Sequence, residues 1–138
     1  MGVPNYILAS GLDVIIAQRL VRRLCPHCIE SYDADSNQID IIKYMLKDLG
    51  IEALASKKDE FKLYKSKWCS ECGMTGYKGR IGIYEVMNFS EDIRTLIRLG
   101  SSPKEIITAA RKWDLMLMRE DGILKAMQWK TSLEEVFK

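Results

Sequence analysis

The stretches Cys25-Pro26-His27-Cys28 and Cys69-Ser70-Glu71-Cys72 contain all four cysteines of this 138-residue sequence. Two residues between paired cysteines let a tight turn direct both sulfurs to one side, and two such turns complete the four-thiolate shell of a structural zinc site. The predicted ligands of one zinc ion are therefore Cys25, Cys28, Cys69 and Cys72.

Other uses of these residues compete with the zinc site. A redox dithiol or disulfide pair is the second interpretation, although a redox motif needs only one doublet. His27 could replace a sulfur ligand, but a surface position or a hydrogen bond to a thiolate is the simpler prediction. Four thiolates around Zn²⁺ leave a local charge of about −2. Basic residues close in sequence can offset this charge: Arg23, Lys67, Lys78 and Arg80.

Length and composition predict a small soluble protein with one ordinary domain or two very small ones. Hydrophobic residues make up 47% of the chain, enough for a modest core. The 21 basic and 19 acidic side chains nearly balance, so net charge gives no case for nucleic-acid binding. The sequence has neither a membrane-spanning apolar run nor a signal peptide of the usual form, which predicts an intracellular protein with reduced thiols.

Apolar periodicity predicts an amphipathic helix from Leu12 to Leu24. Its apolar residues recur at every fourth position: Leu12, Ile16, Leu20 and Leu24. Ser10 or Asp13 is the candidate cap. Before this helix, Tyr6-Ile7-Leu8 is too short for more than a strand or a connector.

Three arginines fall in the last turns of this predicted helix, namely Arg19, Arg22 and Arg23. Cations are stabilised at the negative end of a helix dipole, which is the simplest explanation for them. A contact with a phosphate or with a partner protein is the alternative.

The insert between the doublets, residues 29–68, is longer than an ordinary zinc-ribbon loop and must contain structure of its own. Ile39 to Leu49 is predicted to be a helix that ends at Gly50, and Phe61 to Trp68 a strand that leads into the second doublet. A second strand, Arg80 to Met87, follows. The glycines there can supply the positive φ angles of tight turns: Gly73, Gly76, Gly79 and Gly82. A phosphate-binding loop is the alternative, but the motif G-x-x-x-x-G-K-[ST] is absent.

The remaining residues are predicted to be helical. Ser90 begins a helix that stops at Gly100, and the capping box Ser102-Pro103-Lys104-Glu105 begins the next. A further helix runs from about Met116 to Trp129, and Thr131-Ser132-Leu133-Glu134 is a capping box for a short terminal helix. The predicted fold class is α+β: a small zinc-stabilised strand and hairpin subdomain with an inserted helix, followed by a small helical subdomain.

Several stretches together resemble one known family. They are Gly2-Val3-Pro4 with Ile7-Leu8-Ala9-Ser10, Ala17 to Cys28, Cys69 to Glu85, and Glu120-Asp121-Gly122 with Thr131 to Val136. In this order they resemble the traffic ATPases that drive type II secretion and type IV pilus assembly. The insert 29–68 is the part least matched. Asp114 and Trp129-Lys130 stand where a family member is expected to have glycine.

The resemblance implies a C-terminal fragment with three parts. Residues 1–24 would be the end of the ATPase core, 25–88 the tetracysteine zinc-binding subdomain, and 89–138 the terminal helical subdomain. The phosphate-loop lysine, the magnesium-binding acid and the histidine box of such ATPases are absent from the sequence. We therefore assign no catalytic or nucleotide-binding residue to this chain, and ATP and magnesium only to its full-length parent.

The implied function is that of a non-catalytic zinc module, structural or used for docking, in an ATP-driven motor. The motor would be a cytoplasmic hexamer at the inner face of the inner membrane. Its partners would be the rest of the ATPase, the neighbouring subunits and an inner-membrane platform protein, through which it associates peripherally with the membrane. The sequence leaves open whether the motor serves secretion or pilus assembly.

The competing function is a stand-alone zinc ribbon that binds nucleic acid. It is favoured by aromatic and basic residues near the second doublet, Trp68, Tyr77, Lys78 and Arg80, because stacking rings beside cations can hold a single strand. A net charge of only +2 argues against it, and no nucleic-acid partner is expected.

Overall fold

The computed structural model describes residues 2–49 and 61–138. It divides into two compact units, each built from two stretches of chain. Unit 1 comprises Met1–Ala17 and Glu85–Leu117, and unit 2 comprises Gln18–Tyr84 and Met118–Lys138. Helices and strands are mixed, which confirms the α+β class. The three parts predicted from the family resemblance, residues 1–24, 25–88 and 89–138, are defined along the sequence and not by these contacts. They stay a prediction.

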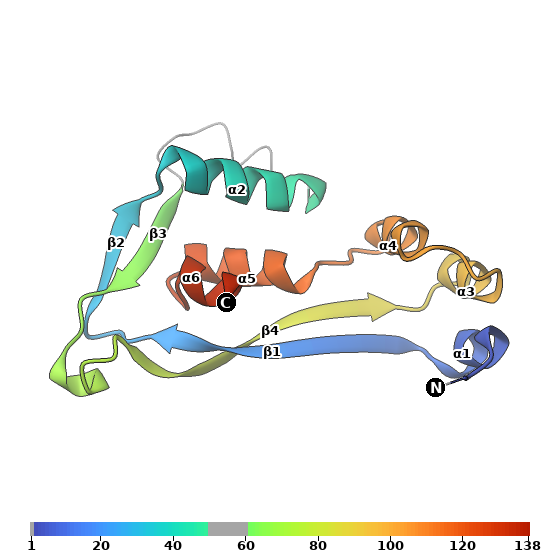
Figure 1. The fold of residues 1–138 in the computed structure, drawn as a ribbon, viewed down its shortest axis with the longest axis horizontal. Helices are drawn as coiled ribbons and strands as arrows, with labels where there is room; N and C mark the ends of the chain where they lie inside the picture. Colours follow the sequence, from blue (N-terminus) through green and yellow to red (C-terminus); the bar gives the residue numbers. More distant parts are fainter. Residues whose placement is uncertain (1, 50–60) are drawn as a thin grey trace. The chain divides into compact units, whose positions relative to one another are not determined.

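Two small sheets organise the strands (Figure 1). β1 (Val14–Leu24) pairs with β4 (Tyr77–Asn88), and β2 (Ile29–Asp33) pairs with β3 (Lys62–Ser66). The second pair is antiparallel, with Ile29 opposite Ser66 and Asp33 opposite Lys62. The strands predicted at Phe61 to Trp68 and at Arg80 to Met87 are both confirmed, the first shorter and the second longer than predicted.

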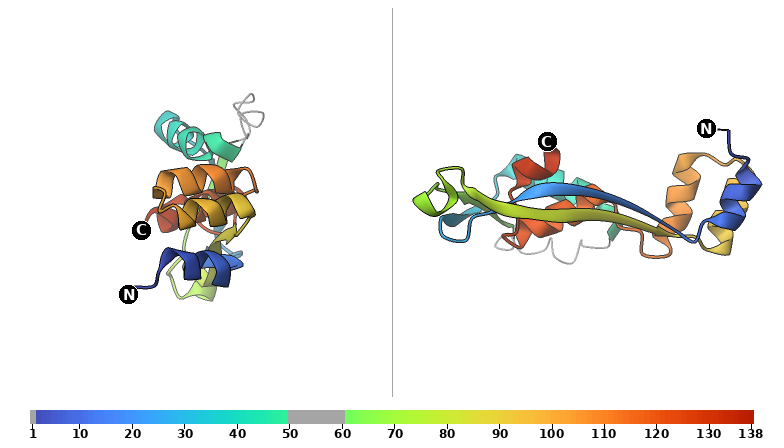
Figure 2. Two further views of the ribbon diagram at one scale, coloured as in Figure 1. Left: turned by 90° about the vertical axis from the view of Figure 1, so that its right-hand side faces the viewer. Right: turned by 90° about the horizontal axis from the view of Figure 1, so that it is seen from below.

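The helix predicted from Leu12 to Leu24 is wrong, because this segment is strand β1. Figure 2 shows β1 and β4 running side by side. A spacing of four residues fits one face of a helix, but it is also a multiple of the two-residue strand repeat, so the same residues share one face of a strand. The β-branched residues Val14, Ile15, Ile16 and Val21 favour the strand.

The strand or connector predicted at Tyr6-Ile7-Leu8 is also corrected, because these residues belong to helix α1 (Asn5–Gly11), which begins after Pro4. Ser10 caps no later helix, and its hydroxyl donates to the Tyr6 carbonyl at 2.9 Å. Asp13 accepts a hydrogen bond from Arg94 at 2.9 Å. Helix α1 is too short to show a helical periodicity in the sequence. Its contact with the helix Glu91–Arg98 stabilises it.

Unit 1 consists of helices packed on a small core. α1 contacts α3 (Glu91–Arg98), which contacts α4 (Pro103–Arg111). The predicted caps are confirmed: Ser90 Oγ accepts from Ile93 N at 3.4 Å, and Ser102 forms a capping box with Glu105. The buried residues of the core are Phe89, Ile93, Ala110 and Leu115.

Unit 2 packs the second sheet and three helices around a larger core. α2 (Ser36–Leu46) begins with a capping box between Asp35 and Gln38 and continues into a 3-10 turn, Lys47–Leu49. The predicted stop at Gly50 lies outside the described residues. α5 (Met118–Met127) contacts α2, β3 and α6 (Leu133–Phe137). The buried core residues are Ile42, Leu46, Phe61, Leu63, Ile123, Ala126, Leu133 and Val136.

Among the described helices, three end in the same way. A residue in the left-handed region follows the helix, and the N–H of the next residue donates to the carbonyl five residues before it. These residues are Gly100 after α3, Asp114 after α4 and Trp129 after α5, with φ angles of 68°, 59° and 59°. The closing bonds run from Ser101, Leu115 and Lys130 to the carbonyls of Leu96, Ala110 and Lys125. Glycine is the usual residue at this position, so Asp114 and Trp129 hold a conformation that glycine adopts without strain.

Candidate metal centre

The four cysteine sulfurs lie together, with all Sγ atoms within 4.8 Å of one another. The Sγ–Sγ distances are 3.9 Å for Cys25–Cys69, 3.9 Å for Cys28–Cys72 and 3.7 Å for Cys69–Cys72. All four are free thiols rather than disulfides. A tetrahedron with Zn–S bonds of about 2.3 Å has sulfurs about 3.8 Å apart. The number, chemistry and spacing of the donors therefore fit a tetrahedral zinc ion.

The first turn, Cys25 to Cys28, is attached by its backbone to the segments that lead to the second. Cys28 N donates to the Cys25 carbonyl at 3.3 Å, which closes the turn. Cys25 N then donates to the Gly76 carbonyl at 3.0 Å, and Lys67 N donates to the Cys28 carbonyl at 2.8 Å. These bonds bring the two doublets together although the whole insert separates them in sequence.

The second turn is a 3-10 turn, Ser70–Cys72, followed by Gly73 with a φ of 58°. Met74 N donates to the Cys69 carbonyl at 2.9 Å, and Gly76 N donates to Cys72 Sγ at 3.2 Å. Positive φ is confirmed at Gly73, Gly76 and Gly79 but not at Gly82. Backbone N–H groups directed at a sulfur stabilise the thiolate that a metal needs.

Gly76 is the glycine whose missing side chain matters most here. A Cβ at this position would lie 2.7 Å from Ser66 Cβ and closer still to Ser66 Oγ. The end of β3 would then have to move, and with it the chain that enters Cys69. Close approach, in addition to a φ of 78°, explains why this position is glycine.

The thiols of the cluster are not equivalent before a metal binds. Burial raises the pKa of Cys28 to about 12, together with hydrogen bonds to the other thiols. Burial also acts to raise the pKa of Cys72, but backbone hydrogen bonds at Cys69 and Gly76 outweigh it and lower the pKa to about 6. The lowered pKa of Cys72 favours the thiolate, the form in which a cysteine binds metal.

Two of the basic residues near the cysteines form ion pairs with acidic side chains. Lys67 Nζ lies 2.7 Å from Glu30 Oε1, and Lys78 Nζ lies 3.9 Å from Glu71 Oε2. His27 is exposed, and the candidate metal-binding group in the described part of the chain consists of cysteines alone. The predicted surface position of His27 agrees with this arrangement, and the zinc ligands themselves stay a prediction.

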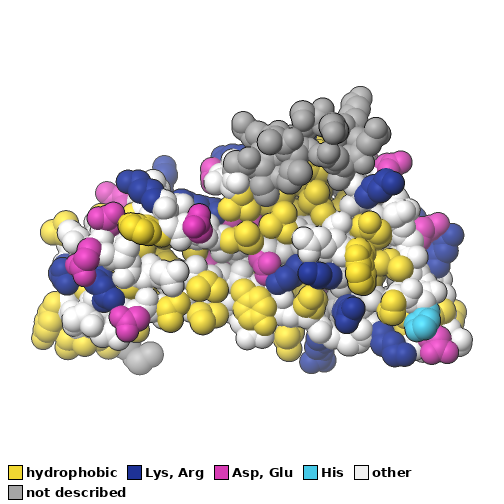
Figure 3. Space-filling model, turned by 180° about the vertical axis from the view of Figure 1, so that it is seen from behind, with side chains coloured by type: hydrophobic (Ala, Val, Ile, Leu, Met, Phe, Trp, Pro, Cys, Tyr) yellow, Lys and Arg dark blue, Asp and Glu magenta, His cyan; other side chains and the backbone are white. Residues whose placement is uncertain are grey.

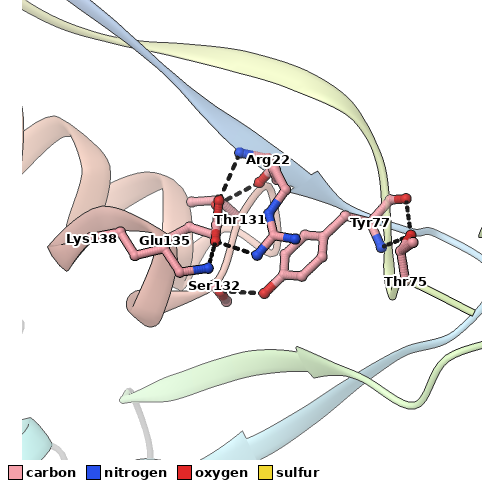
Figure 4. Close-up of polar contacts among 7 residues, drawn as sticks. All are labelled: Arg22, Thr75, Tyr77, Thr131, Ser132, Glu135 and Lys138. Atoms are coloured by element: carbon pink, nitrogen blue, oxygen red, sulfur yellow. Dashed lines mark hydrogen bonds and ion pairs between the residues drawn. The ribbon is translucent and has the colours of Figure 1, made fainter.

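Arg22 has a different role from the one predicted, since no helix ends there. Its guanidinium donates to Glu135 Oε1 at 2.6 Å and lies 4.1 Å from the centre of the Tyr77 ring (Figure 4). Glu135 is buried, with 6% of its surface exposed, and its hydrogen bond with Arg22 lowers its pKa to about 2. This pair joins β1 to α6.

Two hydroxyl groups also take part in this contact between β1 and α6. Tyr77 Oη lies 3.0 Å from Ser132 Oγ, and Thr131 Oγ1 donates to the Arg22 carbonyl at 2.8 Å. The capping box predicted at Thr131 is therefore wrong: the N-cap of α6 is Ser132, and it makes no side-chain capping bond. The sequence does not reveal this group of contacts, because Arg22, Tyr77 and Ser132 are more than fifty residues apart and no spacing rule connects them.

Features proposed for nucleic-acid binding are only partly available. Trp68 is 61% exposed, but the Tyr77 ring is covered by Arg22 and its hydroxyl contacts Ser132. On the face drawn in Figure 3, Lys and Arg side chains are interspersed with Asp and Glu rather than gathered into a basic patch. In residues 2–49 and 61–138, no helix combines the length and apolar character needed to cross a bilayer.

Comparison with known proteins identifies the family. Residues 1–138 match the family model described as type II/IV secretion system protein. The type IV pilus assembly ATPase PilB of Thermus thermophilus is 38% identical over 136 residues, which are 99% of this chain and 14% of that protein. PilB of Pseudomonas aeruginosa is 39% identical over 136 residues, 99% of this chain and 22% of that protein.

A secretion protein matches over the same length of this chain. The type II secretion system protein E of Pseudomonas aeruginosa is 36% identical over 138 residues, which are 100% of this chain and 25% of that protein. The chain thus spans between 14% and 25% of the length of these curated relatives. Because the family model covers the whole sequence, this chain belongs to the type II/IV secretion system protein family.

Proposed function

We propose that this chain is a zinc-binding, non-catalytic module of an ATPase that powers type II secretion or type IV pilus assembly. Membership of the family and relatives named as pilus assembly ATPases support the class of machine. The four-sulfur cluster is the single observation that supports the role of the module. The zinc ion would be held by Cys25, Cys28, Cys69 and Cys72.

The chemistry of the donor set argues for a structural ion. A zinc ion with four thiolate ligands has no open coordination position, so it neither activates water nor polarises a phosphate. What these residues can do is hold two turns together. The backbone bonds of Cys25 to Gly76 and of Lys67 to Cys28 then fix the ends of both sheets to the cluster.

The chemistry of ATP belongs to the longer protein in this proposal. The sequence contains no G-x-x-x-x-G-K-[ST] loop, whose backbone amides and lysine hold the phosphates in such enzymes. This chain alone is therefore expected not to hydrolyse ATP. ATP and magnesium would bind the core of the full-length ATPase.

A coupling role follows from the surface that the cluster supports. The strand Tyr77 to Met87 and helix α2 would present this surface to a neighbouring subunit of a hexamer or to an inner-membrane platform protein. Exposed apolar residues on α2 support it: Ile41 is 46% exposed and Tyr44 is 68% exposed. The site of action would be the cytoplasmic face of the inner membrane, reached through these partners.

The test uses the full-length ATPase with Cys69→Ser and Cys72→Ser together. Nucleotide binding, basal ATPase rate and secretion or piliation are measured on the same variant, after circular dichroism establishes that it is folded. Ser70→Ala, in the same turn, is the matched control. We expect nucleotide binding to persist while transport is lost. Loss of nucleotide binding in a folded variant would place the module inside the catalytic machinery instead.

A further inference from the structure

Unit 2 contains a cavity of about 410 Å³ beside the second cysteine turn. Four aromatic side chains line it, contributed by β2, β3, β4 and the segment before Cys69: Tyr32, Tyr64, Trp68 and Tyr77. Cavities that bind small molecules have volumes of roughly 300 to 1,000 Å³ and are lined by apolar and aromatic groups with a few polar ones. The size and the lining of this cavity both fall within that description.

Two of the groups at the cavity are already engaged. The Tyr77 ring lies under the Arg22 guanidinium, whose charge is paired with Glu135 at 2.6 Å, and the Tyr77 hydroxyl contacts Ser132 (Figure 4). These residues form a fixed wall with little free charge. The groups available to a ligand are therefore on the β2–β3 side of the cavity.

Trp68 is the most exposed of the four rings, at 61%, and its backbone has a φ of 59°. A bulky residue in the left-handed region is strained, and such strain is found preferentially at ligand and active sites. Its position depends on Gly76, where a Cβ would lie 3.3 Å from Trp68 Cδ1. The indole is thus an exposed ring held in place beside the cavity.

Lys65 supplies the charge. Its ammonium lies 5.4 Å from the centre of the Tyr32 ring. Lys65 stands opposite Glu30 in the β2–β3 register, but among the described residues the ion pair of Glu30 is with another lysine. Lys67, two residues further along, is paired with Glu30 at 2.7 Å. The acid in the lining is Glu134, which is exposed and can accept a hydrogen bond from a ligand.

We propose that this cavity binds a small molecule in which a planar aromatic ring carries an anionic group and a hydrogen-bond donor. The ring would stack against Trp68 or Tyr64, because offset-stacked aromatic rings attract one another. The anionic group would contact Lys65, and the donor would face Glu134. The site does not depend on the ATPase activity of a longer protein.

The test is an NMR titration of the ¹⁵N-labelled 138-residue chain with probes that separate ring from charge. AMP and 4-hydroxyphenylacetate carry ring, anion and donor. Adenosine and 4-hydroxyphenylethanol keep the ring and the donor but lack the charge, and inorganic phosphate and acetate lack the ring. We expect at least one charged aromatic probe to shift the Trp68 indole and Lys65 amide signals, and to bind at least about fivefold more tightly than its neutral counterpart.

Variants assign the effect to the residues. Lys65→Met should remove the difference between charged and neutral probes, whereas Lys67→Met should keep it. Trp68→Ala should weaken binding about fivefold or more, whereas Trp113→Ala, at a tryptophan of unit 1 that is 55% exposed, should not. Preference for AMP would identify the ligand as a nucleotide, and preference for 4-hydroxyphenylacetate as an aromatic acid. No binding up to about 5 mM of either, or binding unchanged by Lys65→Met, would overturn the proposal.

Discussion

The two units of this chain are stabilised by different interactions. In unit 2, segments far apart in sequence meet at the four-sulfur cluster and at the buried pair Arg22–Glu135. In unit 1, the described residues contain no such metal-binding group, and the acid of the ion pair Arg94–Asp13 is exposed; three short helices pack on a core of four buried residues. Removing a metal or protonating an acid should therefore act on unit 2, while truncating an apolar side chain should be felt where the core is smallest.

Metal removal is the largest expected effect. The chain should contain one zinc by elemental analysis, and structural zinc contributes on the order of 10 kcal/mol in zinc-finger peptides. Cys72→Ser or strong chelation should therefore abolish hydrogen-exchange protection in the sheets of unit 2, while amides of α3 and α4 remain partly protected. A metal-free chain with an unchanged melting curve would contradict the zinc site.

The redox alternative makes a different prediction for the same protein. A disulfide would leave fewer than four thiols to react with a thiol reagent after denaturation, whereas a zinc site leaves all four and releases the metal as they react. The present geometry, with free thiols 3.7–3.9 Å apart, predicts the second result.

Core truncation comes next. Ile93 in unit 1 and Ile123 in unit 2 are both fully buried, and isoleucine-to-alanine changes cost about 2–5 kcal/mol. Ile93→Ala should lower the protection of α3 and α4 without changing the zinc content. Ile123→Ala should lower that of α5 and β3. If both variants lose protection everywhere, the two units unfold as one cooperative unit.

Lowering the pH should destabilise unit 2 through Glu135. Because the pKa of Glu135 is lowered to about 2, its stabilising effect is complete above the ordinary carboxylate pKa and is lost as the pH falls through the folded value. Glu135→Gln should cost about 2 kcal/mol at pH 7. The difference in unfolding free energy from wild type should shrink between about pH 4.5 and pH 2. Glu134→Gln, the exposed neighbour, is the control and should show no such difference.

The smallest effect concerns the helix ends of unit 1. Asp114→Gly should raise the melting temperature, by a stabilisation of up to about 1 kcal/mol, because glycine adopts a φ of 59° without strain. Gly100→Asp makes the opposite change at the equivalent position after α3. It should lower the melting temperature, by a destabilisation of similar size. Equal responses of both variants would show that local backbone strain does not limit the stability of unit 1.

Local chemistry allowed part of this structure to be predicted from sequence. The cysteine spacing predicted a single cluster, since two C-x-x-C turns can direct four sulfurs to one point. Ser90 and Ser102 predicted the starts of α3 and α4, because a cap and its partner are three residues apart. The glycines predicted the turns after Cys72. Asp114 and Trp129, where the family resemblance implies glycine, both have a positive φ.

What could not be predicted depends on distant partners. The segment Val14–Leu24 has a spacing compatible with helix and strand, and its pairing with β4 decides between them. Glu135 reads as an ordinary surface acid of an amphipathic helix until Arg22 is placed beside it. Thr131 has the sequence of a helix cap, but its hydroxyl donates a hydrogen bond to the Arg22 carbonyl instead. In each case a contact across the chain outweighed a local preference.

The hydrogen bond from Cys25 to Gly76 has a consequence for the folding kinetics. It lies where β1 ends and β4 begins, so these strands form a hairpin whose connection is about fifty residues long. Each doubling of a loop adds about 0.6 kcal/mol to its closure cost. An ion that joined the doublets first would shorten the effective connection to a few residues and save about 2 kcal/mol of that cost. Zinc present during refolding would then act as the turn of this hairpin, and strand pairing would be faster than in a chain that receives the metal afterwards.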